Sequence, residues 1–195
     1  MFWKINEFLL EMLNSLWKYE FIWFLVQIFA DWPILLIPIF LVTMRIIAVK
    51  NKNLVLKYNL MHIFYWCVIG ITFSLLIQQF IHIKRPEEHL QWIGNLLIKH
   101  IPNASFPSDH ATVWFAFIVW LYLFWYKKSA LIFLPLMTLM VLSRIIAWVH
   151  WPYDIIAWII IGYISAYISY SLLTKNKFVK KLNFLIIKLL SVVRL

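Results

Sequence analysis

Residues of catalytic types occur at three places in this chain, each beside a long apolar run. Arg85 follows one run, the segment 107–110 (Pro-Ser-Asp-His) opens the next, and Arg144, His150 and Asp154 bridge the last two. Arginine guanidinium groups bind phosphate oxygens through a planar fork of donors. Two histidines that titrate near neutral pH can serve as nucleophile and proton donor. This combination predicts chemistry on a phosphate group.

Two finer relations follow from local spacing. Asp154 lies four residues after His150, near enough to accept a hydrogen bond from the imidazole ring and to fix its tautomer. Ser108 lies where a helix is predicted to begin. Its hydroxyl and the neighbouring backbone N–H groups would therefore face an anion at the positive end of the helix dipole.

The elements that must position these residues are membrane-spanning helices. The chain of 195 residues is 64% apolar and 13% charged, whereas soluble domains are about 45–50% apolar and about 25% charged. This composition excludes both a disordered chain and an ordinary soluble domain. A spanning helix needs about 20 mostly apolar residues. Five stretches meet or approach that length: 33–49, 60–83, 111–126, 130–149 and 153–173.

We therefore predict an all-α fold, a polytopic membrane helix bundle with about five spanning helices, an N-terminal interfacial helix and a basic C-terminal helix. Alternating helices would bring the three polar places to one membrane face, where ionisable groups are costly and usually functional. Asp31 is expected to cap the first spanning helix, with Pro33 in its first turn. The chain is predicted to be one domain, 1–195, with an interfacial helix, 1–31, a spanning bundle, 33–173, its outer loop, 84–109, and a cytoplasmic amphipathic tail, 175–195.

The net charge of +10 points first to nucleic acid, but its distribution favours a membrane. Basic residues gather in short clusters between apolar runs, and twelve of the 18 fall on one side of the predicted bundle without any acid. The positive-inside rule places that side in the cytoplasm and the loop 84–109 outside. No nucleic-acid partner is therefore expected, and the tail 175–195 is expected to touch anionic lipid. The single cysteine, Cys67, allows no intramolecular disulfide.

The three polar places also resemble the signature motifs of the type-2 phosphatidic acid phosphatase superfamily, which includes membrane lipid phosphatases and vanadium haloperoxidases. The motifs here read Arg85-Pro86, then Pro-Ser-Asp-His at 107–110, then Ser-Arg at 143–144 with His150 and Asp154. Asp109, where most members have Gly, resembles the bacitracin-resistance type of undecaprenyl diphosphatase. The first motif usually opens with Lys, and here that position is Gln78, which can donate a hydrogen bond but brings no charge.

The resemblance implies that His150 attacks the phosphorus and forms a phosphohistidine, that Asp154 orients it, and that His110 protonates the leaving oxygen and later activates water. It also implies a set of phosphate-binding groups: Arg85, Ser108, the backbone N–H of Asp109, Arg144, and Gln78 in the Lys position. No metal and no cofactor are expected, and the sequence has no carboxylate cluster of the kind that Mg²⁺ sites use.

The expected function is that of a metal-independent lipid phosphatase that removes the terminal phosphate of undecaprenyl diphosphate. The expected location is the outer face of the bacterial inner membrane, with membrane lipids and a polyprenyl or other lipid phosphate as the partners and no obligate protein partner. A phosphatase or phosphotransferase acting on phosphatidylglycerophosphate or lipid A is the alternative, since the loop 86–106 would decide the acceptor. A non-catalytic lipid-phosphate-binding protein is a further alternative, and Gln78 is the only feature that favours it.

Overall fold

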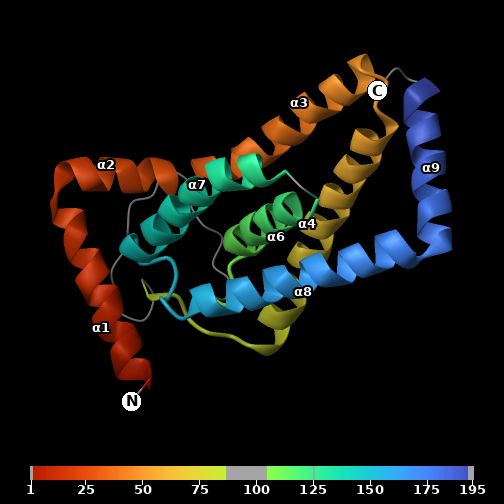
Figure 1. Ribbon diagram of the computed structural model, residues 1–195. Coiled ribbons are helices and arrows are strands. Elements are labelled where there is room, and N and C mark those ends of the chain that lie inside the picture. Colours follow the sequence, from red (N-terminus) through yellow and green to blue (C-terminus); the bar gives the residue numbers. More distant parts are fainter. Residues whose placement is uncertain (1, 87–104, 125, 193–195) are drawn as a thin grey trace.

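The computed structural model describes residues 2–86, 105–124 and 126–192, and these residues form helices without any strand. The predicted all-α class is therefore confirmed. The helices, shown in Figure 1, are α1 (Phe2–Asn14), α2 (Glu20–Phe29), α3 (Leu36–Lys50), α4 (Leu54–Phe80), α6 (Asp109–Leu123), α7 (Lys127–Ile146), α8 (Asp154–Lys175) and α9 (Lys177–Val192). Most of the outer loop predicted over 84–109 lies outside the described residues. The same holds for most of the loop 86–106, which was expected to decide the phosphate acceptor.

Four stretches of the described chain are long and apolar enough to cross a membrane: Glu20–Lys50, Leu54–Phe80, Lys127–Ile146 and Asp154–Ser171. The fifth predicted span, α6, is apolar but only 15 residues long. α6 lies in the middle of the bundle and packs against α4, α7 and α8 (Figure 1). The predicted polytopic bundle is confirmed, with α6 as its centre.

Aromatic side chains fix α6 in this central position. Trp114, Phe117 and Trp120 of α6 are almost completely buried. Trp120 meets Trp66 of α4 edge to face, with 6.4 Å between ring centroids, and Phe117 makes a similar contact at 5.1 Å with Phe133 of α7. Such edge-to-face pairs add directional attraction to apolar burial. The start of α6, where Ser108, Asp109 and His110 lie, is therefore held on a rigid support.

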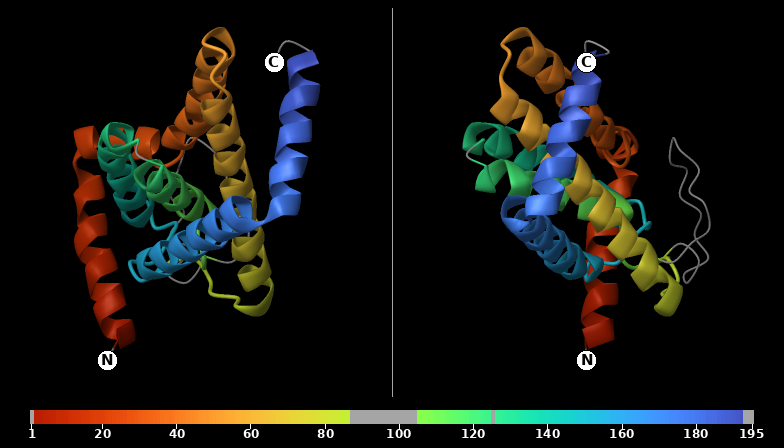
Figure 2. Two further views of the ribbon diagram at one scale, coloured as in Figure 1. Left: turned by 45° about the vertical axis from the view of Figure 1, so that its right-hand side comes forward. Right: turned by 90° about the vertical axis from the view of Figure 1, so that its right-hand side faces the viewer.

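The N-terminal region, predicted as one interfacial helix over 1–31, is not a single helix. The structure divides it into α1 and α2, separated by a 3-10 turn over Ser15–Lys18 and by the extended backbone of Tyr19. Figure 2 shows α2 turned sharply away from α1. Pro33 does lie in the first turn of the next element, Trp32–Leu35, but Asp31 makes no capping hydrogen bond there. Asp31 lies at the N-cap position, as predicted, but its carboxylate pairs with Arg144 of α7 and does not cap the helix.

The C-terminal basic segment forms α9, which lies against α4 and α8. Asn176 begins it, because the side-chain oxygen of Asn176 accepts hydrogen bonds from the backbone N–H groups of Phe178 and Val179. Asn183 and Ile187 face the bundle and are buried. The four lysines of α9 are exposed: Lys177, Lys180, Lys181 and Lys188. The cytoplasmic position of α9 stays a prediction.

Gly162 of α8 lets α8 approach α6 closely. A Cβ on Gly162 would lie 2.7 Å from Cδ1 of Phe115 and 3.2 Å from the backbone nitrogen of Ala116. A Cβ on Gly70 of α4 would lie an ordinary 3.4 Å from the Thr112 methyl group. Gly162→Ala therefore overpacks the α6–α8 contact, whereas Gly70→Ala does not.

We expect Gly162→Ala to lower the free energy of unfolding by about 1–3 kcal/mol and to lower the melting temperature in detergent. Gly70→Ala is the matched control. It should be neutral, or stabilising by up to about 1 kcal/mol through helix propensity. Equal melting temperatures for the two variants would contradict the close approach of α8 to α6.

Candidate active site

The three polar places predicted from the sequence meet at one end of the bundle. Arg85 follows α4, Ser108 immediately precedes α6, Arg144 lies in the last turn of α7, and His150 and Asp154 lie between α7 and the start of α8. Hydrogen bonds join these segments directly. The backbone N–H of Ser105 donates to the Ile83 carbonyl at 2.7 Å, and the indole N–H of Trp151 donates to the Lys84 carbonyl at 2.9 Å.

His150 and Asp154 are adjacent and almost completely buried. Nδ1 of His150 lies 3.3 Å from Oδ2 of Asp154. The same carboxylate oxygen accepts a hydrogen bond from the backbone N–H of Trp151 at 2.9 Å. A carboxylate at Nδ1 favours the tautomer that carries its proton there. Nε2 of His150 then keeps its lone pair, as the nucleophilic role predicted for His150 requires.

Ser105 is a polar residue of the site whose role the sequence did not predict. Its hydroxyl donates to Oδ2 of Asp154 at 2.8 Å and lies 3.4 Å from Nδ1 of His150. Ser105 is fully buried. Its place just before the Pro-Ser-Asp-His segment was the only sequence signal for it. Ser105 thus links the segment before α6 to the carboxylate that orients His150.

The two arginines have different partners. Arg144 directs Nη2 at Nε2 of His150, 3.3 Å away, while its Nη1 bonds the N-terminal region. Arg85 donates from Nη1 to the carbonyl of Val149 at 3.0 Å and so holds the backbone that carries His150. Both guanidinium groups are buried. The arrangement places positive charge beside His150, as binding of a phosphate group requires.

Ser108 has an unused hydroxyl. It occupies the N-cap position of α6 without a capping hydrogen bond, and its buried Oγ has no partner among the described residues. A buried polar atom left unsatisfied costs about 1–3 kcal/mol, which a phosphate oxygen could recover by accepting a hydrogen bond. His110 lies in the first turn of the same helix and is half-buried. Its charge, together with those of Arg85 and Arg144, acts on His150.

Gln78 contacts Asp109, so the two residues that depart from the usual superfamily motifs are partners. The amide nitrogen of Gln78 donates to Oδ1 of Asp109 at 3.1 Å and to the Pro107 carbonyl at 2.9 Å. The hydroxyl of Ser74 donates to the same carboxylate oxygen. Gln78 thereby holds the turn that precedes α6. Direct phosphate binding by Gln78 and by the backbone N–H of Asp109 stays a prediction.

The pKa of His150, which lies in the connection between α7 and α8, is held well below its usual value of 6.5. Burial is the main cause, and the positive charges of Arg144, Arg85 and His110 lower it further. His150 is therefore neutral at neutral pH, with the lone pair that nucleophilic attack needs. The part of the chain that the structure describes contains no group of three or more His, Cys, Asp or Glu side chains able to hold a metal ion.

Residues 60–178, more than half of the chain, match the PAP2 superfamily, and the chain therefore belongs to that superfamily. Over 88 residues it is 34% identical to the bacitracin transport permease protein BcrC of Bacillus licheniformis, a match that covers 45% of this chain and 43% of that protein. Over 74 residues it is 35% identical to YbjG of Escherichia coli (strain K12), whose name provisionally assigns it as an undecaprenyl-diphosphatase, with 37% of each chain covered. The chain thus spans less than half the length of these curated relatives. No solved structure gives a significant match.

The lowered pKa of His150 predicts the acid side of the pH–rate profile. Protonation removes the nucleophilic lone pair, so kcat/KM should fall only as the pH drops to a value well below 6.5. Arg85→Gln removes one of the charges that lower this pKa and should move the acid limb to higher pH. The substitution leaves the ionisation of the free substrate unchanged, so a shift of the limb would come from the enzyme. An acid limb near pH 6.5 that Arg85→Gln does not move would contradict the environment described for His150.

The contact between Gln78 and Asp109 predicts coupled effects of mutation. Gln78→Ala and Asp109→Ala each remove the hydrogen bond that holds the turn before α6, and each should lower kcat by up to about tenfold. The loss in the double variant should be smaller than the product of the two single losses, because both changes remove the same hydrogen bond between Gln78 and Asp109. Gln79→Ala, at the exposed neighbouring position, is the control and should keep wild-type kcat. Losses that multiply in the double variant would show that the two residues act separately.

Proposed function

We propose that this chain is a lipid phosphatase that removes the terminal phosphate of undecaprenyl diphosphate through a phosphohistidine at His150. One observation carries the proposal. Nε2 of His150 lies 3.3 Å from the Arg144 guanidinium, while Nδ1 lies 3.3 Å from the Asp154 carboxylate. A nucleophile, the acid that orients it and an anion-binding group are therefore adjacent, as nucleophilic catalysis on a phosphate requires.

The reaction proceeds in two transfers. Nε2 of His150 attacks the terminal phosphorus, the bond from phosphorus to the bridging oxygen breaks, and His110 gives its proton to the leaving undecaprenyl phosphate. In the second transfer His110 takes a proton from water, the water oxygen attacks the phosphorus, and the phosphorus–nitrogen bond breaks. Inorganic phosphate leaves and His150 is restored. Asp154 holds the Nδ1 proton throughout and stabilises the positive charge that develops on the ring.

The transferring phosphoryl group would lie between the arginines and the start of α6. Arg144 offers Nη2 and Nε, and Nε has no hydrogen-bond partner among the described residues. Ser108 offers its unpartnered hydroxyl from the N-terminus of α6, where backbone N–H groups also favour an anion. Arg85 adds a second buried positive charge nearby. These groups are the phosphate-binding set of the proposal.

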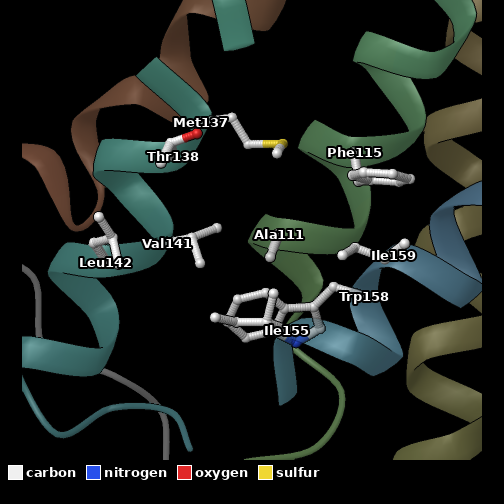
Figure 3. A pocket seen from close by; sticks show the side chains of 9 residues that line it. All are labelled: Ala111, Phe115, Met137, Thr138, Val141, Leu142, Ile155, Trp158 and Ile159. Carbon is white, nitrogen blue, oxygen red and sulfur yellow. The ribbon is translucent and has the colours of Figure 1, made fainter. Parts of the chain in front are cut away.

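An apolar pocket beside His150 supports a lipid as the substrate. It has a volume of about 180 Å³ and lies between α6, α7 and α8 (Figure 3). Trp158 forms the wall shared with the site, because its ring meets that of His150 edge to face at 5.3 Å. The pocket is lined by Ala111, Phe115, Met137, Thr138, Val141, Leu142, Ile155, Trp158 and Ile159. The first carbons of a prenyl chain would be removed from water there, which favours binding by about 0.8 kcal/mol for each buried CH₂.

Two further observations support undecaprenyl diphosphate and an outward-facing site. The name of YbjG refers to hydrolysis of that lipid, and the name of BcrC refers to bacitracin. The lysines of α9 and of the other basic clusters lie, in the predicted topology, on the side opposite the motifs. By the positive-inside rule the site would then face the exterior of the inner membrane.

Phosphate release by purified protein in detergent tests the proposal, with undecaprenyl diphosphate, phosphatidylglycerophosphate and lipid A as substrates. We expect release from undecaprenyl diphosphate, inhibition by vanadate and no loss with a chelator. His150→Ala and His110→Ala should each lower kcat by about 10³-fold or more. His82→Ala is the control, since His82 is exposed at the end of α4, and it should keep wild-type activity.

The other outcomes of the phosphate-release assay would each overturn a particular part of the proposal. Release from phosphatidylglycerophosphate or lipid A instead would overturn the substrate, and transfer to a lipid acceptor would replace hydrolysis. Full activity in His150→Ala would overturn the phosphohistidine. No release from any of the three lipids by folded protein would favour a lipid-phosphate-binding protein.

A further inference from the structure

We propose that Asp31 is a positioning residue for Arg144, supplied to the active site by the N-terminal region of the chain. Asp31 lies outside residues 60–178, the region that matches the PAP2 superfamily. The inference rests on the proposed function, because it concerns how Arg144 is presented to the phosphoryl group. Its test nevertheless has a readout that needs no lipid turnover.

The contact between Asp31 and Arg144 is a buried ion pair. Nη1 of Arg144 lies 2.7 Å from Oδ1 of Asp31, and each side chain is only 2% exposed. The same Nη1 donates to the carbonyl of Ala30 at 3.0 Å. The two N–H groups of Nη1 therefore have two acceptors, both supplied by the short connection that follows α2.

This pairing decides which edge of the guanidinium faces the reaction. The guanidinium is planar, with five N–H donors in a fixed arrangement. With Nη1 occupied, the edge formed by Nη2 and Nε is left for an anion. Nη2 lies 3.3 Å from Nε2 of His150, and Nε has no partner among the described residues. Two phosphoryl oxygens bound to that edge would bring the phosphorus beside the nucleophilic nitrogen.

The N-terminal region is fixed to the connection between α7 and α8 on both sides of His150. The Asn14 side chain donates to the Ile146 carbonyl at 2.7 Å, and the Asn6 side chain accepts from the backbone N–H of Tyr153 at 3.1 Å. Val26 of α2 is buried in a small cluster with Ile146, Ala147 and Val149. Asp31 is therefore held in place by contacts independent of Arg144, and so it can orient the arginine rather than follow it.

The test compares Asp31→Asn with wild type in kcat, KM and affinity for vanadate, a mimic of the transferring phosphoryl group. Asn keeps the shape of the side chain but removes the charge that fixes Nη1. We expect kcat to fall about 10–100-fold, since small misplacements of a catalytic group have effects of that size. KM should change less than about threefold, because the lipid tail still binds. Affinity for vanadate, followed by tryptophan fluorescence, should fall by a factor similar to that in kcat.

Two further variants separate positioning from folding. Glu20→Gln neutralises an exposed acid of α2 and should match wild type in every measurement. Asp31→Glu keeps the charge and the ion pair but displaces the guanidinium by one methylene, so it should fold as wild type does, with lower kcat and weaker vanadate binding. If Asp31→Asn does not fold, the kcat and the vanadate affinity of Asp31→Glu test the positioning role of Asp31.

Wild-type kcat and vanadate affinity in folded Asp31→Asn, or in Asp31→Glu where Asn does not fold, would overturn the role of Asp31. An equal loss in Glu20→Gln would overturn it too. If the wild-type protein binds vanadate but hydrolyses no lipid, the proposed function fails, and the vanadate affinities of the variants still test Asp31. Wild-type protein that does not bind vanadate at all would overturn both.

Discussion

The buried positive charge of Arg144 is the constraint on which the rest of the site depends. A guanidinium out of water must be paired, and removing one partner of a buried ion pair costs about 3–5 kcal/mol. Asp31 and the Ala30 carbonyl pair one end of it, and His150 faces the other. The connection that follows α2, the last turn of α7 and the connection that carries His150 must therefore fold together. The contact between Nη2 of Arg144 and Nε2 of His150 gives the buried guanidinium a further partner and also positions the proposed nucleophile.

The remaining contacts extend this arrangement to the other helices. Arg85, which follows α4, donates a hydrogen bond to the Val149 carbonyl. Ser105, which precedes α6, donates a hydrogen bond to the Asp154 carboxylate. The aromatic packing around α6 gives that segment a fixed support. Each functional side chain thus lies at a helix end, while the helices supply the rigid frame. The apolar pocket between α6, α7 and α8 lies next to the polar site, with Trp158 between the pocket and His150. This arrangement suits a phosphate attached to a hydrocarbon chain.

The sequence predicted those features that depend on local pattern. Apolar runs predicted α4, α7 and α8, and the four-residue spacing predicted that Asp154 lies beside His150. Contacts between distant segments have no such signal. Asp31 and Arg144 are 113 residues apart. The local pattern before Pro33 predicted the N-cap position of Asp31, which the structure has, but it gave no sign that the carboxylate pairs with Arg144. The sequence did not predict the contact between Gln78 and Asp109 for the same reason, although both positions were recognised as departures from the motifs.

The most direct test of this site is to trap the covalent intermediate. Wild-type protein would be mixed with undecaprenyl diphosphate labelled with ³²P in the terminal phosphate, quenched within milliseconds in alkali, and digested for peptide mapping. A phosphohistidine at His150 predicts an alkali-stable, acid-labile label on the peptide that contains residue 150, and no label in His150→Ala. A label on another residue, or rapid phosphate release without any labelled protein, would contradict the role assigned to His150.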